Sequence, residues 1–359
     1  MTRRGFVLGG VSAGALLAAP GVALAQPGAG AGRDAGRRAG VLEGGPDIVD
    51  CGGWGARPNS AVVPVWNQRP VKILVHHTAS PNVADTSRGA ADAVARSIQN
   101  FHMDARGWLD TGQHFTISRG GFVLEGRHRS LEVLRGGRQQ VEGAHCTGQN
   151  VVAVGIENEG IYIDQDPPGA LWDSLRATCA YICGQYGIAP TELYGHRDFK
   201  NTICPGDRLY GMLPRLRSEV AGVLGQRIEG GEVKASWPLL RQGDSGEQVL
   251  AAQYLLRDAG VAVKTDGRFT PATAAALTEF QVATGAEEPN GILGGESWPV
   301  LARTVERGEG SDAERAVDSL ASGNTEAVPD TVDHSAWQRL LGTGGAEVDQ
   351  TVDPVGPVR

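Results

Sequence analysis

The sequence lacks two features: a basic cluster typical of nucleic-acid-binding proteins and, beyond the N-terminus, an apolar run long enough to span a membrane. No cluster of Lys and Arg interleaved with aromatic residues occurs in its 359 residues, and the formal net charge is -8. A nucleic-acid-binding protein normally presents a basic face, so we expect no nucleic-acid partner. Beyond the first 25 residues, no stretch approaches the roughly 18 apolar residues that span a bilayer. We therefore expect no integral membrane segment once the N-terminus has been removed.

The N-terminus has the composition of an export segment. Arg3 and Arg4 precede an apolar stretch that extends to about Val22, and small residues before Gln26 suit a signal peptidase. This pattern predicts a twin-arginine-type signal peptide over residues 1–25. The alternative is a chance arginine pair in front of a membrane anchor. With cleavage, we expect a secreted protein.

Cysteine is scarce, and its count is odd. The chain has five cysteines: Cys51, Cys146, Cys179, Cys183 and Cys204. In an oxidising compartment, an odd count leaves at least one thiol with another role. Cys179 and Cys183 lie four residues apart in a helical pattern and share a face. We therefore expect each to form a disulfide with Cys51 or Cys146 rather than with the other.

Two regions carry the periodic patterns of folded domains. Residues 47–225 interleave strand and helix patterns, which predicts an α/β domain with a mixed central sheet flanked by helices. Residues 237–302 have only helical patterns and predict a small all-α domain. The other segments bury too little apolar surface to order themselves: a flexible leader at 26–46, a linker at 226–236, and an acidic, mostly disordered tail at 303–359.

The α/β region contains several distinct element patterns. Residues 71–76 are apolar and β-branched, which is typical of a buried strand. The other expected elements are a helix at 90–103, a hairpin formed by 114–117 and 122–124, a strand at 151–157, and helices at 168–187 and 209–224.

The all-α region contains an internal repeat. The residues Asp266-Gly267, Phe269, Thr273 and Leu277 recur as Asn290-Gly291, Leu293, Ser297 and Leu301 at identical offsets. Each copy predicts a turn that leads into a capped helix.

Three side chains suit a metal ion. His76 closes the apolar strand at 71–76, and His77 must face the other way because strand side chains alternate. His196 follows a short apolar segment, and Cys204 comes eight residues later. Two imidazoles and a thiolate leave a fourth tetrahedral position for water, as in catalytic zinc sites. Taken singly, a histidine is more often an ordinary core or surface residue, and Cys204 could instead form a disulfide.

Five sequence motifs, in order, resemble one enzyme family. They are Trp54-Gly55-Ala56-Arg57-Pro58, His76-His77-Thr78-Ala79, Gly143-Ala144-His145, Gly195-His196-Arg197-Asp198 and Cys204-Pro205-Gly206. Over about residues 50–222 the chain resembles the zinc-dependent type 2 N-acetylmuramoyl-L-alanine amidases, a superfamily that includes the peptidoglycan recognition proteins. The resemblance implies one zinc ion per chain with His76, His196 and Cys204 as ligands. It also implies cleavage of the amide between N-acetylmuramic acid and L-alanine at the cell wall.

The resemblance also implies roles for other residues. Glu157, at a strand end, matches a catalytic glutamate and is the candidate general base, although it could be a solvated carboxylate. Thr202 stands where some relatives have Lys and could donate to an oxyanion or cap its own loop. His145 is a candidate substrate contact or a buried hydrogen-bonded residue. Gln113 replaces the tyrosine of many relatives, which makes Glu157 more necessary. Asp198 could orient a ligand histidine or form a surface turn.

Residues 237–301 resemble the three-helix peptidoglycan-binding domain that often accompanies wall hydrolases. The resemblance rests on Leu240 to Gly246, Gln253, Asp266 to Phe269, Phe280-Gln281 and Trp298. We therefore expect a monomer whose partner is peptidoglycan or muropeptides. Two alternatives are a recognition protein that binds muropeptides without cutting them and a zinc peptidase. The complete ligand set argues against the first, and the absence of His-Glu-x-x-His argues against the second.

Overall fold

A computed structural model of the chain describes residues 45–228, 237–304 and 357–358. The predicted signal peptide, most of the leader and nearly all of the tail lie outside these residues. The domain boundaries expected from the sequence therefore stay predictions. Within the described ranges, no helix combines the length and apolar character needed to cross a membrane.

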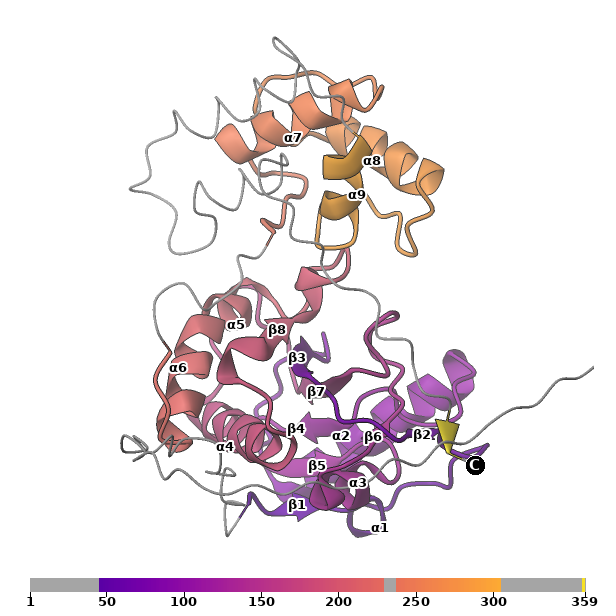
Figure 1. Cartoon of the computed structure of the whole chain (residues 1–359), viewed down its shortest axis with the longest axis vertical. Coiled ribbons are helices and arrows are strands. Elements are labelled where there is room, and N and C mark those ends of the chain that lie inside the picture. Colours follow the sequence, from indigo (N-terminus) through magenta and orange to yellow (C-terminus); the bar gives the residue numbers. More distant parts are fainter. Residues whose placement is uncertain (1–44, 229–236, 305–356, 359) are drawn as a thin grey trace, which may run out of the picture. The chain divides into compact units, whose positions relative to one another are not determined.

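The larger domain is built on a six-stranded sheet in the order β1-β5-β4-β7-β3-β8 (Figure 1). The strands are β1 (Ile48–Val49), β3 (Lys72–His77), β4 (Phe115–Ile117), β5 (Val123–Glu125), β7 (Ala153–Asn158) and β8 (Leu193–Gly195). Strands β4, β7, β3 and β8 are parallel, whereas β5 is antiparallel to β4 and parallel to β1. The predicted mixed sheet is thus confirmed. The four parallel strands place their carboxyl ends at one edge.

Helices cover both faces of this sheet. On one face, Ile73 and Val75 of β3 pack against Leu175 of α4 (Gly169–Tyr186) and Leu216 of α6 (Leu213–Val223), with α3 (Ser130–Gly136) contributing to the same core. On the other face, Ala91 of α2 (Arg88–Asn100) packs with α1 (Cys51–Trp54) and with β5. Figure 1 shows α4 and α6 together on one side of the sheet. Because side chains alternate along a strand, each strand contributes to both layers.

Local sequence explains where these helices begin and end. Helix α4 follows Pro168 and ends at Gly187, whose φ of 76° belongs to the left-handed region that favours glycine. The helix predicted at 209–224 is instead two helices, α5 (Asp207–Gly211) and α6. Pro214 lies in the first turn of α6, where its missing N–H costs least, so the second helix begins there. A π-helical turn, η1 (Phe101–Ala105), extends α2.

Three short strands form a second, antiparallel sheet. They are β2 (Val65–Trp66), β6 (Gln140–Val141) and β9 (Pro357–Val358), with β2 in the centre.

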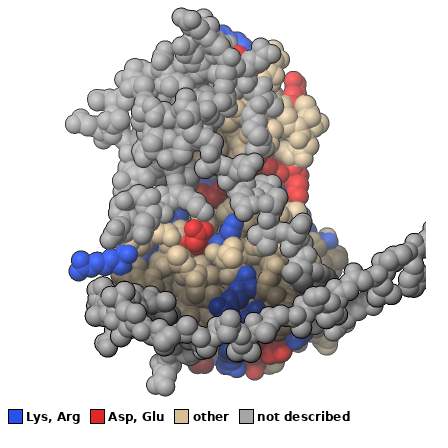
Figure 2. Space-filling model, in the orientation of Figure 1, with Lys and Arg blue, Asp and Glu red and all other residues tan. Residues whose placement is uncertain are grey.

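On the face of the molecule seen in Figure 2, basic and acidic residues are interspersed among other residues.

The predicted disulfides are absent, and that prediction is wrong for this structure. All five cysteines lie in the described part of the chain, and all five are free thiols. Cys179 and Cys183 of α4 pack in the main core, whereas Cys51 of α1 belongs to a cluster with Leu124 and Cys146 to a cluster with Leu74. Cys51, Cys146 and the Cys179/Cys183 pair therefore lie in three different clusters, so the expected partners of Cys179 and Cys183 are not buried with them.

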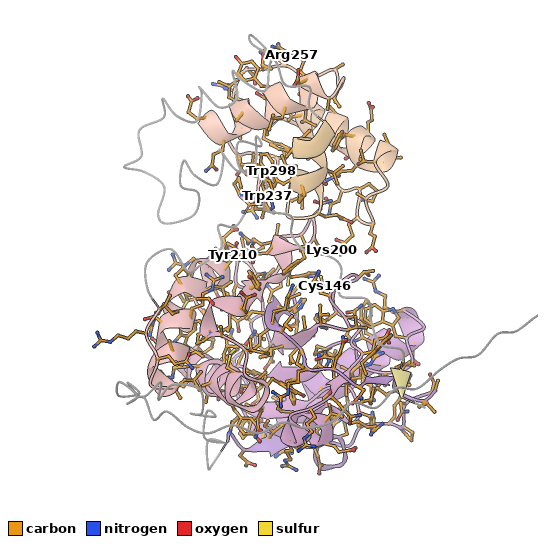
Figure 3. All side chains as sticks on the ribbon, viewed as in Figure 1. Cys146, Lys200, Tyr210, Trp237, Arg257 and Trp298 are labelled. Carbon is orange, nitrogen blue, oxygen red and sulfur yellow. The ribbon has the colours of Figure 1, made fainter. Side chains whose placement is uncertain are left out.

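The C-terminal domain consists of α7 (Glu247–Asp258), α8 (Pro271–Ala283) and α9 (Ser297–Thr304) around one apolar core. The rings of Trp237 and Trp298 stack with an interplanar angle of 9° (Figure 3). The predicted all-α fold of this region is confirmed.

The internal repeat corresponds to two turns that are held in the same way. Gly267 and Gly291 have positive φ values of 68° and 73°, which suit glycine. The buried side chain of Gln253 accepts from the Gly267 N–H and donates to the Arg268 carbonyl. The buried Gln281 likewise accepts from the Gly291 N–H and donates to the Ile292 carbonyl. Each helix thus fixes the turn that follows it.

Candidate metal centre

The carboxyl ends of three neighbouring parallel strands meet at one edge of the larger sheet. Strand β3 ends with His76 and His77, β7 ends with Glu157 and Asn158, and β8 leads directly into η3 (His196–Asp198). His76 lies in register with Glu157, so both side chains leave neighbouring strands on the same face. In open α/β sheets, ligands bind outside the carboxyl ends of strands.

The three expected metal ligands lie together at this edge. One ligand atom each from His76, His196 and Cys204 falls within 4.8 Å of the others. The ring centroids of His76 and His196 are 4.4 Å apart, and the Cys204 Sγ is 3.8 Å from the His76 Nδ1. His77 faces away, and its Nδ1 accepts from the Tyr162 N–H at 3.4 Å. The backbone N–H of His77 donates to the Cys204 Sγ at 3.3 Å.

Arg197 holds the loop that carries His196 and Cys204. Its backbone N–H donates to the Cys204 carbonyl at 3.0 Å, and its Nη2 donates to the Ile203 carbonyl at 2.9 Å. The same guanidinium pairs with Asp207 at 2.8 Å and lies over the ring of Tyr210, which Figure 3 labels. A buried guanidinium paired with a carboxylate and bonded to the loop in this way fixes His196 and Cys204 relative to each other.

The electrostatics of the cluster suit a bound cation. Burial lowers the pKa of His196 to about 4 and holds the pKa of His76 well below its ordinary value, so both imidazoles are neutral and offer a lone pair. Burial raises the pKa of the Cys204 thiol, and the His77 N–H and the Arg197 charge offset this rise only in part. Two neutral imidazoles and a thiol that needs a cation to ionise match the donor set of zinc.

Glu157 lies beside the cluster and is partly buried. Burial raises its pKa from 4.5 to about 8. When ionised, its negative charge also raises the pKa of the Cys204 thiol. A carboxyl with a pKa near neutrality can exchange protons at neutral pH.

His145 contacts His76 directly. Its Nδ1 is 3.1 Å from the His76 Nε2, and the two rings meet edge to face at 5.1 Å. The Nε2 of His145 is 3.3 Å from the Ala153 carbonyl. His145 therefore lies at the edge of the candidate ligand set, with its Nδ1 toward His76.

Two other candidates have local contacts. The Thr202 hydroxyl accepts from the Cys204 N–H at 3.2 Å, the loop contact considered as its alternative role. Asp198 accepts from the Gly195 N–H at 2.8 Å and from the Tyr210 hydroxyl. Asp198 is partly buried and thus holds the backbone at the start of η3.

Sequence reasoning missed two residues of this centre. The role of Arg197 depends on contacts with Ile203 and Asp207, which no periodic pattern reveals. Gly155 lies inside β7, and a Cβ placed there would lie 2.5 Å from the Cγ of His145. A glycine inside a strand indicates a close approach of other atoms, and that rule could have identified it.

Two protein-family models match parts of the chain. A family model described as N-acetylmuramoyl-L-alanine amidase matches residues 66–207. A second model, described as a putative peptidoglycan binding domain, matches residues 245–301.

Curated relatives include both recognition proteins and amidases. Peptidoglycan recognition protein 1 of Bos indicus is 31% identical over 195 residues, which cover 54% of this chain and 90% of that protein. The N-acetylmuramoyl-L-alanine amidase of Sus scrofa is 31% identical over 187 residues, which cover 49% of this chain and 29% of that protein. The match thus spans under a third of the pig enzyme.

A solved structure of wild-type Drosophila PGRP-LB is 30% identical, covers 46% of this chain and 91% of its own, and has a TM-score of 0.41. From the family match and the nearly full-length relative, this chain belongs to the family of type 2 N-acetylmuramoyl-L-alanine amidases and peptidoglycan recognition proteins, and it carries a C-terminal domain of the peptidoglycan-binding type.

Proposed function

We propose that the chain is a zinc-dependent amidase that hydrolyses the amide between N-acetylmuramic acid and L-alanine in peptidoglycan. The observation that carries this proposal is the meeting of His76, His196 and Cys204 at the carboxyl ends of β3 and β8, with Glu157 beside them. A site built only for recognition needs no such combination of metal donors and a carboxyl of raised pKa.

Two imidazoles and one thiolate would hold one zinc ion per chain and leave a position open for chemistry. When bound, zinc supplies Lewis acidity toward a water molecule and toward the carbonyl oxygen of the amide. Arg197 keeps two of the three ligands at a fixed separation, because it follows His196 in the chain and bonds to Ile203 and Cys204 at the other end of the loop.

Glu157 would act as the general base and then as the general acid. Its carboxylate accepts a proton from the attacking water and passes that proton to the leaving nitrogen of L-alanine. Thr202 would assist at the carbonyl oxygen. Its hydroxyl oxygen accepts from Cys204, and a hydroxyl that accepts can also donate its own proton. With no charge, its contribution to an oxyanion is modest.

We also propose that residues 47–225 form the catalytic domain and that residues 237–302 bind peptidoglycan. The match of residues 245–301 to a peptidoglycan-binding family supports the second assignment. A wall-binding domain on the same chain raises the effective concentration of substrate. The arginine pair and apolar stretch within residues 1–25 support export to the cell wall through a twin-arginine signal.

The test combines zinc content with the release of new L-alanine amino groups from purified peptidoglycan. We expect the wild type to hold one zinc per chain and to release amino groups. Cys204→Ser should lose both, whereas Glu157→Gln should keep zinc and lose about 10²–10⁴-fold in turnover. Cys183→Ser removes a buried thiol from the main core and serves as the matched control that keeps both.

A second outcome would favour muropeptide recognition without cleavage. If the wild type binds muropeptides with zinc present or absent and releases no amino groups, the amidase proposal fails. Gln113, at the position where many relatives have tyrosine, gives that outcome a specific structural basis.

A further inference from the structure

A chain of hydrogen-bonding groups leads from a backbone carbonyl to the candidate zinc ligands. The Ala153 carbonyl lies 3.3 Å from the Nε2 of His145, and the Nδ1 of His145 lies 3.1 Å from the Nε2 of His76. The remaining nitrogen of His76, Nδ1, lies 3.8 Å from the Cys204 Sγ. One ring thus bridges a main-chain acceptor and a candidate zinc ligand.

The direction of these hydrogen bonds follows from the acceptor at the far end. A carbonyl can only accept, so the Nε2 of His145 must carry the hydrogen of that ring. In a neutral imidazole the other nitrogen is then an acceptor, so the Nδ1 of His145 receives a hydrogen from the Nε2 of His76. His76 is left with its lone pair on Nδ1, the nitrogen nearest to Cys204.

The protein backbone holds His145 in this position. The side-chain oxygen of Asn150 accepts from the backbone N–H groups of both His145 and Cys146 at 2.9 Å. Gly155 gives the ring its space, because a Cβ there would lie 2.5 Å from the Cγ of His145. A Cβ at Gly143 would lie 2.6 Å from the Cδ2 of the same ring. A glycine therefore lies next to the His145 ring both in the loop just before His145 and in β7.

We propose that His145 is a positioning residue that fixes the ring orientation and tautomer of the zinc ligand His76 by accepting its Nε2 hydrogen. The inference rests on the proposed zinc site. Partners of this kind, which bond to the free nitrogen of a ligand histidine, determine which nitrogen faces the metal. Here the partner is a neutral imidazole rather than a carboxylate, so it sets geometry without adding negative charge to the site.

The first measurement uses the metal-free full-length protein. Long-range ¹H–¹⁵N NMR correlations at neutral pH identify the protonated nitrogen of each neutral histidine. We expect hydrogen on the Nε2 of His76 and on the Nε2 of His145. Hydrogen on the Nδ1 of His76 would overturn the inference, and this result does not depend on whether the protein binds zinc or cleaves peptidoglycan.

The second measurement is zinc affinity, determined by competition with a chromogenic chelator. His145→Phe keeps the size of a ring and removes the acceptor, and it should weaken zinc binding about 10–100-fold. His145→Asn places an amide oxygen near the position of Nδ1 and should restore most of this loss. Gly155→Ala, which pushes the ring away without changing it, should also weaken zinc binding. His128→Asn, a partly exposed histidine that pairs with Asp110, is the control and should leave it unchanged.

Two results would contradict the inference. One is equal zinc affinity of His145→Phe and wild type in the chelator competition. The other comes from the spectrum of the Co²⁺-substituted protein: a changed coordination number in His145→Phe would make His145 a ligand instead. If the wild type binds no zinc while the NMR tautomers are as expected, the proposed function fails and the His145–His76 hydrogen bond stands.

Discussion

The raised pKa of Glu157 has a measurable consequence for stability. Its carboxyl has a pKa of about 8 in the folded protein, whereas 4.5 is the ordinary value that applies in the unfolded chain. Below pH 4.5 the group is protonated in both states. Between pH 4.5 and 8 the unfolded chain releases this proton and the folded protein keeps it, so unfolding becomes more favourable as pH rises.

The size of the effect follows from the shift. One pKa unit corresponds to about 1.4 kcal/mol, so the shift at Glu157 limits the effect to about 5 kcal/mol between these pH values. The carboxyl is only partly buried, and water reduces the effect. We therefore expect about 2–5 kcal/mol.

Glu157→Gln isolates this contribution, because glutamine is nearly isosteric and does not titrate. The free energy of unfolding of metal-free wild type and variant is measured with urea at pH 5 and pH 8. The buried histidines titrate in both proteins, so taking the difference between the proteins removes most of their contribution. The variant should gain at least about 2 kcal/mol over the wild type on going from pH 5 to pH 8. An equal pH dependence in the two proteins would refute the reasoning.

Four further outcomes are expected. Arg197→Gln removes the guanidinium that spans the loop to Cys204, so zinc affinity should fall in a chelator competition while thermal unfolding still shows a folded protein. Gln281→Leu leaves the Gly291 N–H and a carbonyl without their buried partner and should destabilise the C-terminal domain by about 2–3 kcal/mol, measured by urea unfolding. Gln253→Leu should have a similar effect, because it holds the equivalent turn. When the chain is unfolded without reductant, it should react with five equivalents of a thiol reagent. Reaction with three or fewer would show that disulfides form, as the sequence predicted.

Local patterns were sufficient for most of the secondary structure. The strand expected at 71–76 and the helix expected at 168–187 agree with β3 and α4 to within one residue at each end. Alternation along the strand also predicted that His76 and His77 face opposite ways, and the two side chains do so. These features depend on neighbours in the chain, so short-range chemistry reveals them.

Features that depend on distant contacts were predicted poorly or missed. The disulfides were wrong because spacing along a helix says nothing about which thiols meet across the core. The break at Met212 between α5 and α6 was missed because apolar periodicity continues through it. The contact of His145 with His76 joins residues 69 positions apart and requires Gly155 on a third segment.

The sequence by itself determined the donors of the candidate site: two imidazoles and a thiol of suitable chemistry, each at the end of an element or in a loop. Tertiary structure decided that these donors meet. Strand β3 lies between β7 and β8, which come from much later in the chain, and this order brings Glu157 and His196 to either side of His76. Hydrogen bonding between strands and burial of their apolar faces select that order, and neither is encoded in any local pattern.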